Sequence, residues 1–224
     1  CPGVRNAISM AEKIVADKET VYCLGSIIHN KDVVERLARA GLKTVENIDR
    51  IESGTVLIRS HGAAPSEIKK LREHGLEIVD ATCVLVKRMQ KIAMELEKEG
   101  YKLVVIGDSN HPEVKAVVGC VDNVEVIADE DDLDKLPKDT KLGVVCQTTK
   151  GPEHFANMVQ AIVRRGFSEL KVINTLCKET IKRQQAAVDV CKRVDVMFVL
   201  GGLDSANTKR LVELCKKYNE QTFH

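Results

Sequence analysis

The feature that most constrains the fold of this chain is a regular alternation of short apolar runs with amphipathic helical segments. The runs are rich in Val, Ile and Leu and almost continuously apolar, as is typical of parallel strands covered by helices on both faces. This alternation predicts an α/β fold. The expected strands are 20–24, 56–59, 77–80, 102–106, 124–127, 143–146, 171–174 and 196–200. The expected helices are 31–40, 66–74, 85–98, 131–136, 153–165, 179–193 and 205–217, with one more after Pro112.

Two local patterns recur along the chain. A strand, a small-residue loop and a helix occur at 56–71, 104–117 and 198–211. A strand, a cysteine and a helix occur at 78–93 and 172–187, and 1–16 fits the second half of that pattern. We therefore expect three similar small parallel-sheet α/β units in a trefoil-like arrangement, spanning 1–83, 84–173 and 174–224. Because the chain opens on Cys1 and its last residues resemble the start of a strand, we expect residues missing in front and a larger piece behind.

Composition argues against several classes of partner. The net charge is +1, from 34 basic and 33 acidic residues, so no strong overall field favours nucleic acid or an acidic membrane. Aromatic residues make up 3% and Trp is absent, which leaves little on which bases could stack. The longest apolar stretch, 196–203, is interrupted by two glycines and is far shorter than the roughly 20 residues of a spanning helix. Without a signal-peptide pattern, we expect a globular cytoplasmic protein.

Three of the eight cysteines share one kind of position. Cys1, Cys83 and Cys177 each occupy the turn before a helix, where the helix dipole and free N–H groups stabilise a thiolate. Their separations of 82 and 94 residues match no compact metal motif, but three converging units would bring them together. Three thiolates can hold either zinc with a fourth ligand or a [4Fe–4S] cluster with one open iron. We expect the other five cysteines to be small buried hydrophobes.

Polar side chains also gather where strands end. They are His29, His61, His111, Glu113, Thr148, Thr149, Ser205 and Asn207. For Ser205 and Asn207, ordinary helix N-capping is the simpler explanation. Taken together, imidazoles, neutral donors and helix N-termini form a suitable lining for an oxyanion such as a diphosphate. Neither GxGxxG after the first strand nor GxxxxGK[ST] is present, so a dinucleotide or P-loop nucleotide site is not expected.

A series of short motifs then becomes informative as a set. In chain order they are CPGVRNAI at Cys1, IIHN at His29, SHG at His61, DATC at Cys83, HPEV at His111, QTT at Gln147, C–T–RQ from Cys177 to Gln184, and SANTKRL at Ser205. With this set the chain resembles 4-hydroxy-3-methylbut-2-enyl diphosphate reductase, the last enzyme of the non-mevalonate isoprenoid pathway. The resemblance covers all 224 residues.

The resemblance implies three α/β units around a central [4Fe–4S] cluster and a reductive removal of hydroxyl from an allylic diphosphate. It implies that electrons come singly from an external donor, ferredoxin or flavodoxin. By position, the implied cluster ligands are Cys1, Cys83 and Cys177, the implied diphosphate binders are His29, His61, His111, Ser205 and Asn207, the implied proton source is Glu113, and Thr148 lies near the substrate hydroxyl.

The chain departs from the family pattern in several places. Val84 stands where many relatives have Pro, and Lys178-Glu179 stand where a small residue usually precedes the Thr. Ala206 replaces a serine that donates to phosphate, and the chain stops before the family's last diphosphate-binding serine. Three other readings stay open from the residues themselves: a zinc-dependent hydrolase or structural zinc protein, a cluster-based redox sensor, and a diphosphate-sugar-binding α/β protein with idle cysteines.

Overall fold

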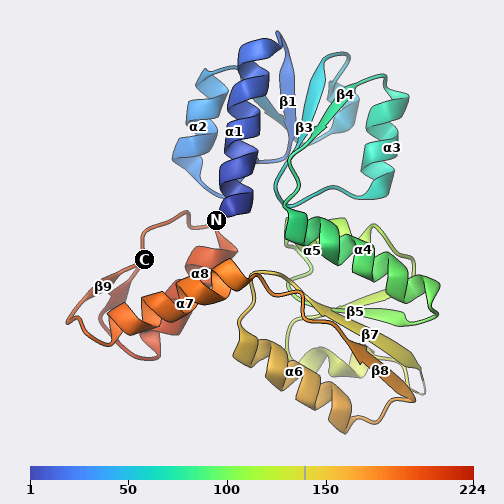
Figure 1. Ribbon diagram of the computed structural model, residues 1–224, viewed down its shortest axis with the longest axis vertical. Coiled ribbons are helices and arrows are strands. Elements are labelled where there is room, and N and C mark those ends of the chain that lie inside the picture. The colour runs from blue at the N-terminus through green and yellow to red at the C-terminus, as the bar shows by residue number, and fades with distance from the viewer. Residues whose placement is uncertain (139) are drawn as a thin grey trace.

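Three parallel sheets hold the strands of the computed structural model, which describes residues 1–138 and 140–224. The first sheet has the order β2-β1-β3-β4, the second the order β6-β5-β7-β8, and the third pairs β10 with β9. The strands are β1 (Val21–Leu24), β2 (Leu42–Val45), β3 (Thr55–Ile58), β4 (Glu77–Asp80), β5 (Lys102–Ile106), β6 (Val124–Ile127), β7 (Lys141–Cys146), β8 (Glu169–Val172), β9 (Met197–Phe198) and β10 (Thr222–Phe223). Figure 1 shows the sheets, with their helices, arranged as three lobes around one centre. The predicted α/β class and trefoil-like arrangement are confirmed.

Helices separate the strands almost as the sequence predicts. They are α1 (Pro2–Asp17), α2 (Lys31–Arg39), α3 (Pro65–Glu73), α4 (Val84–Lys98), α5 (Pro112–Val118), α6 (Pro152–Arg164), α7 (Lys178–Cys191) and α8 (Ala206–Lys216), with 3₁₀ turns η1 (Ile48–Arg50) and η2 (Glu130–Lys135). The helix expected at 131–136 is thus a 3₁₀ turn. The strand β2 was not expected, because it lies at a sheet edge with only Leu42 buried and gives no apolar run. Within the described residues, none of the helices combines the length and the hydropathy that a membrane-spanning segment requires.

The order of elements repeats from one lobe to the next. The first and second lobes both run helix, strand, helix, strand, 3₁₀ turn, strand, helix, strand, and the third contains the first four of these elements. By place in the sheet, β5 and α5 therefore correspond to β1 and α2, and not to β3 and α3. The grouping of 56–71 with 104–117 is corrected accordingly, because local patterns alone cannot tell two strand–loop–helix segments apart. The proposed units 1–83, 84–173 and 174–224 each contain one of α1, α4 and α7 as their first helix.

Alternate residues of each strand enter different cores. In β5, Leu103 and Val105 pack with α4 and α5, whereas Val104 and Ile106 pack with α6. In the first lobe, Leu57 packs with α1 and α2, while its neighbour Val56 packs on the other face with α3. Both faces of each four-stranded sheet are therefore covered, which explains why the strands read as unbroken apolar runs. Because the strands are parallel, their carboxyl ends share one edge of each sheet, and the loops that leave those ends form the site.

The core of the second lobe offers a test of this packing. Leu142 in β7 is fully buried, so Leu142→Ala removes apolar contacts and leaves a cavity. We expect a loss of about 2–5 kcal/mol in the free energy of unfolding, measured by urea denaturation. Val163→Ala is the control, because Val163 in α6 is 58% exposed. This substitution should change the free energy of unfolding by less than about 0.5 kcal/mol. Equal effects of the two substitutions would contradict the assigned core.

Candidate active site

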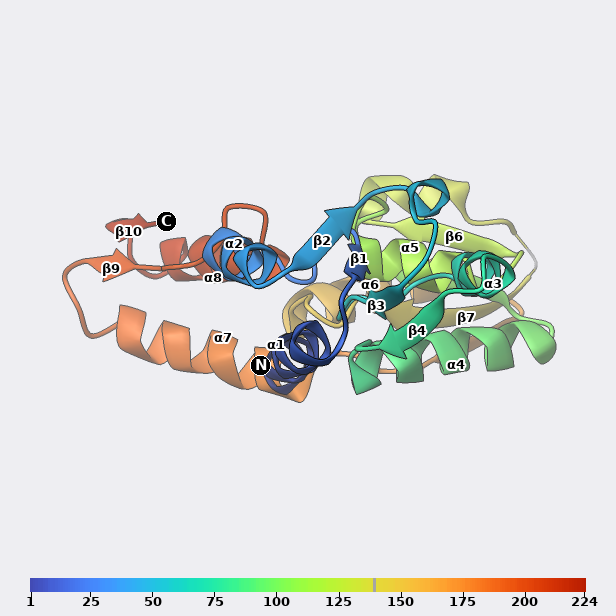
Figure 2. The same ribbon diagram turned by 90° about the horizontal axis from the view of Figure 1, so that it is seen from above.

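The first three-fold feature of the centre is a cysteine at the start of a helix. Cys1, Cys83 and Cys177 are the N-cap residues of α1, α4 and α7, and none of the three helices receives a hydrogen bond from a side-chain cap. Cysteine is not among the residues that commonly cap helices, so its use at all three equivalent positions is not explained by helix stability. In Figures 1 and 2 the starts of the three helices turn toward one another at the centre of the molecule.

Contacts around the thiols agree with this convergence. A Cβ added to Gly3, in the first turn of α1, would lie 2.7 Å from the Sγ of Cys83, so glycine is what lets that sulfur approach the helix that Cys1 begins. Cys177 lies near the main-chain nitrogen of Cys1. Main-chain hydrogen bonds fix the other two, from the Cys83 amide to the Ser60 carbonyl at 3.0 Å and from the Cys177 amide to the Thr148 carbonyl at 2.9 Å.

The spacing of the thiols bears on which group they could hold. Tetrahedral zinc with Zn–S bonds of about 2.3 Å would bring three sulfurs to about 3.8 Å from one another. Among the described residues, the three cysteines do not belong to a set whose ligand atoms all lie within 4.8 Å. An iron–sulfur cluster binds each thiolate through a different iron and so spaces its ligands more widely. The donor set, one thiolate from each of three lobes, fits a cluster in which three irons each take one thiolate.

The remaining cysteines are poorer candidates. Cys23, Cys146, Cys191 and Cys215 are buried in the lobes, and Cys120 is half-buried. Burial raises the pKa of Cys23 and of Cys146 to about 12, and that of Cys215 to about 11. A thiol must lose its proton to bind a metal, so burial of this kind disfavours it as a ligand. These residues agree with the expectation of small hydrophobic side chains.

Three histidines from three different loops meet beside the thiols. The rings of His29 and His61 have centroids 4.7 Å apart, and the ring of His111 lies 5.9 Å from the first and 5.5 Å from the second. His29 follows β1, His61 follows β3 and His111 follows β5. The Nε2 atom of His29 and the Nδ1 atom of His61 are buried without a hydrogen-bond partner in the described part of the chain. Buried polar atoms are seldom left unpaired, so this cluster is suited to a polar ligand.

Burial and neighbouring positive charge keep the three imidazoles neutral at pH 7. Burial, followed by the proximity of His29 and His111, lowers the pKa of His61 to about 3. Burial and the proximity of His29 lower the pKa of His111 to about 4. The pKa of His29 is lowered too, mainly by burial and then by the charge of Arg59. An anion placed among the three rings would oppose each of these effects.

Glu113 and Thr148 form a buried polar pair in the centre. The Thr148 amide and hydroxyl both donate to the Glu113 carboxylate, at 2.7 and 2.8 Å. Glu113 is 2% exposed, and burial raises the pKa of its carboxyl group, although the two bonds from Thr148 act in the opposite direction. The Glu113 amide also donates to Nδ1 of His111 at 3.2 Å. The pair thus links the histidine cluster to Cys177, whose amide donates to the Thr148 carbonyl. The Glu113 carboxyl group can hold a proton at this point.

Ser205 and Asn207 stand at the start of α8. The Ser205 hydroxyl accepts a bond from the Thr208 amide at 3.3 Å, which is the N-capping role that the simpler reading assigns to it. Asn207 accepts a bond from the Thr180 hydroxyl at 3.4 Å, and Thr180 lies in the first turn of α7 after Cys177. The loop before α8 packs closely on the first lobe. At the contact, Gly202 lies so near the carbonyl of His29 that an added Cβ would clash with it.

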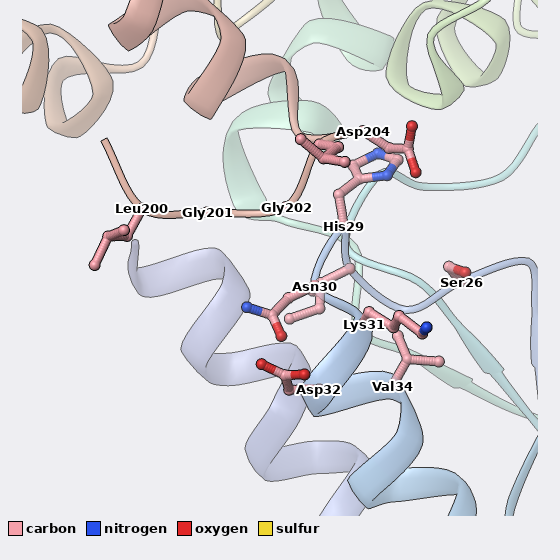
Figure 3. Close-up of a pocket in the computed structure, with 12 residues that line it drawn as sticks. Ser26, His29, Asn30, Lys31, Asp32, Val34, Leu200, Gly201, Gly202 and Asp204 are labelled. Atoms are coloured by element: carbon pink, nitrogen blue, oxygen red, sulfur yellow. The ribbon is translucent and has the colours of Figure 1, made fainter. Parts of the chain in front are cut away.

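A cavity of ≈ 740 Å³ opens between that loop and the loop after β1. Figure 3 shows it bounded on one side by His29 and the start of α2, and on the other by the segment from Leu200 to Asp204. Of the sequence-predicted site residues, His29 lines it, while His61, His111 and Glu113 are not among its lining residues. The cavity therefore offers an approach to the histidine cluster from between the first and third lobes.

Sequence reasoning did not single out Arg59, and it named Gln147 only as the first residue of the QTT motif, without a role. Arg59 directly follows β3, and its charge lowers the pKa of all three histidines. Gln147 is 1% exposed, accepts from the Asp108 amide at 3.0 Å and donates to Thr149 at 2.8 Å, so it ties the loop after β5 to the loop after β7. Their signal was position alone: Arg59 lies two residues before His61, and Gln147 lies directly before Thr148.

Fold and site together define a three-lobed α/β protein with a centre lined by thiols, imidazoles and one buried carboxyl group. The family model described as LytB protein matches residues 1–224. The chain belongs to the LytB protein family.

Named relatives agree with this assignment. The chain is 42% identical to 4-hydroxy-3-methylbut-2-enyl diphosphate reductase of Pelobacter propionicus, with all of the chain and 80% of that protein covered. It is also 42% identical to the reductase of the same name from Geotalea uraniireducens, covering 79% of it. The solved structure of the E-1-hydroxy-2-methyl-but-2-enyl-4-diphosphate reductase from Plasmodium falciparum matches with a TM-score of 0.93 at 27% identity, over the whole chain and 72% of that protein. A second solved structure, of (E)-4-hydroxy-3-methyl-but-2-enyl diphosphate reductase, has a TM-score of 0.76 at 38% identity and is covered to 81%.

The histidine cluster makes stability depend on pH. Unfolded His61 titrates near 6.5 and folded His61 near 3, so between these values the unfolded state binds more protons and a falling pH favours unfolding. Lowering the pH from 7 to 5 should reduce the free energy of unfolding of the wild type. In His61→Gln this reduction should be smaller by roughly 1–2 kcal/mol. Urea titrations at several pH values measure this difference. His74→Gln, at an exposed site, is the control, and a wild-type slope in His61→Gln would contradict the assignment.

Proposed function

We propose that this chain reduces (E)-4-hydroxy-3-methylbut-2-enyl diphosphate to isopentenyl diphosphate and dimethylallyl diphosphate. The carbon–oxygen bond of the allylic alcohol breaks, two electrons and two protons are taken up, and one water molecule leaves. The observation that carries the proposal is the meeting of three N-cap cysteines with a cluster of neutral histidines and a buried carboxyl group. The names of the relatives, at full coverage of this chain, give the substrate.

Cys1, Cys83 and Cys177 would hold a [4Fe–4S] cluster. When bound, such a cluster supplies electrons one at a time and a Lewis-acidic position for the substrate oxygen. The helix N-termini behind the thiols favour their deprotonated form. Gly3 keeps the space beside the Cys83 sulfur free, since any larger residue would press on it.

The diphosphate is assigned to His29, His61 and His111, with Ser205 and Asn207 at the start of α8. Support comes from the unpaired ring nitrogens of His29 and His61, which can offer N–H groups to phosphate oxygens. Nearby Arg59 adds positive charge without occupying the centre of the cluster. Because the imidazoles are neutral beforehand, binding of a highly charged anion draws protons onto them and strengthens the contacts as it occurs.

Glu113 is assigned as the proton source and Thr148 as the group that orients it. Burial keeps the pKa of Glu113 raised, so its carboxyl group retains a proton more readily than an exposed one. The Thr148 hydroxyl at 2.8 Å fixes which way the carboxyl group faces and can pass a proton onward to the substrate hydroxyl. The leaving oxygen can then depart as water.

The electrons are assigned to an external one-electron carrier, ferredoxin or flavodoxin, in the cytoplasm. The sequence shows no built-in flavin or nicotinamide signature, which agrees with an outside donor. Two carrier molecules would each lose one electron for every substrate molecule reduced.

Metal analysis tests the proposal directly. Protein purified without oxygen should contain about four iron and four acid-labile sulfide per chain. Cys177→Ala should lose most of both, whereas Cys23→Ala, which alters a buried strand residue of the first lobe, should keep them. Addition of the substrate should change the iron spectrum of the wild type. Zinc in place of iron would overturn the proposal in favour of a zinc protein, and a cluster whose spectrum ignores the substrate would favour a redox sensor.

Glu113→Gln tests the proton source. The change keeps size and hydrogen bonding but removes the acidic proton, so turnover with dithionite as the reductant should fall by about 100- to 10,000-fold. Iron content and substrate-induced spectral change should remain, since neither needs that proton. Glu153→Gln, at an exposed position in the first turn of α6, is the matched control. Turnover near that of wild type would show that another group delivers the proton.

A further inference from the structure

The surface around the starts of α1, α4 and α7 carries an unusual concentration of positive charge. The first eight residues of these helices, 2–9, 84–91 and 178–185, contain seven basic residues and one acidic residue. The whole chain is almost balanced, with 34 basic and 33 acidic residues. Charge is therefore gathered at the end of the three helices where the cysteines lie.

Helix stability does not explain this concentration. The N-terminal end of a helix has a partial positive charge, so basic side chains there are unfavourable and acidic ones are preferred. The first turns of α1 and α4 contain no acidic residue, and the first turn of α7 contains only Glu179. In all three helices the basic residues near the N-terminus interact unfavourably with the helix dipole. Their presence there indicates a function other than stabilising the helix.

Several of these cations are available to a partner. Arg5, Arg88, Lys178 and Arg183 are exposed, and within residues 1–138 and 140–224 none has a carboxylate partner at 4.0 Å or less. We call these four residues the cationic face. Arg88 reaches only a main-chain oxygen, that of Asn174 at 3.3 Å, which places it across the gap between α4 and the segment leading to Cys177.

The nearest basic neighbours are already neutralised. Lys87 pairs with Asp80 at 2.6 Å and Lys182 with Glu179 at 3.5 Å. On the α1 side, Glu12 pairs with Arg36 at 2.6 Å. The surplus charge near the three cysteines therefore belongs to the cationic face itself.

An exposed apolar side chain stands at the start of α4, in the same helix turn region that carries Arg88. Val84, the residue after Cys83, is 75% exposed, one of the more exposed large hydrophobic residues of the described chain. Beside Cys1 a shallow depression of ≈ 360 Å³ is lined in part by Val4 and Ile8. An apolar centre surrounded by charged side chains is the usual anatomy of a protein interface.

We propose that the cationic face, together with the exposed Val84 at the start of α4, is the docking surface for an acidic one-electron carrier protein. The inference rests on the proposed function, because a reductase with no built-in donor must receive electrons close to the cysteines. Charge complementarity favours an acidic protein, and it would speed encounters and orient the carrier toward the three thiols. In each encounter the reduced carrier loses one electron, so two encounters supply the pair that the reaction consumes.

The double substitution Arg5→Glu/Lys178→Glu tests the docking surface. Lys98→Glu/Lys216→Glu is the matched control, because both lysines are exposed and lie near the far ends of α4 and α8. The position of Lys98, 14 residues along α4 from Val84, places it about 20 Å from the start of that helix. The two variants carry the same change in net charge.

Binding is measured first, without turnover. At low ionic strength, an oxidised acidic [2Fe–2S] ferredoxin should bind the wild type and the control variant, both as purified without oxygen, with equal affinity. It should bind the cationic-face variant at least tenfold more weakly. The difference should shrink as salt is added, because exposed charges are screened. Equal affinity in all three proteins, or an equal loss in the control, would overturn the proposal.

Turnover is measured next, in the cluster-loaded enzyme. With dithionite as the reductant, the cationic-face variant should match wild type in iron content, kcat and KM for the diphosphate. With reduced ferredoxin, its KM for the carrier should rise at least tenfold. A raised KM for the diphosphate with dithionite would show that the face steers the substrate instead, which also overturns the proposal. Failure of the wild type itself to turn over with dithionite would refute the proposed function, and it would leave the binding result unaffected.

Discussion

The structure depends on one geometric constraint, the parallel pairing of every strand. Parallel strands place all their carboxyl ends at one edge of a sheet, and each returning helix begins from that edge. In this chain the edges of three sheets face a common centre, so short loops from all three lobes meet there. Five strand ends thereby contribute His29, His61, His111, Thr148 and Ser205 to one region of the molecule.

The same constraint explains why the cysteines differ from one another in chemistry. Those inside sheets and helix bodies are covered by apolar side chains, which raises the pKa of Cys23 and Cys146 to about 12. Those at helix starts lie where the lobes meet and where free amide groups favour a thiolate. Burial does not separate the two groups by itself, since Cys177 is buried too. The position at a helix start is what distinguishes the three candidate ligands from the five structural cysteines.

Electrostatics in the centre are arranged for a ligand that carries charge. Neutral imidazoles stand together although they would repel one another if protonated, and a buried carboxyl group with a raised pKa lies next to them. Arrangements of this kind cost stability, which the well-packed cores of the four-stranded lobes supply. Outside the centre, exposed cations lie at the helix starts, where an acidic protein can contact them.

The sequence by itself determined the α/β class, most element boundaries and the residues of the centre, because buried parallel strands read as unbroken apolar runs and the motifs lie at their ends. It could not show β2, whose edge position leaves only Leu42 buried, nor the importance of Arg59. Only the tertiary structure decided that β5 corresponds to β1 and not to β3, since equivalence is a property of strand order. It likewise decided the pairing of Glu113 with Thr148, because a contact across 35 residues depends on how two loops meet and leaves no local signal.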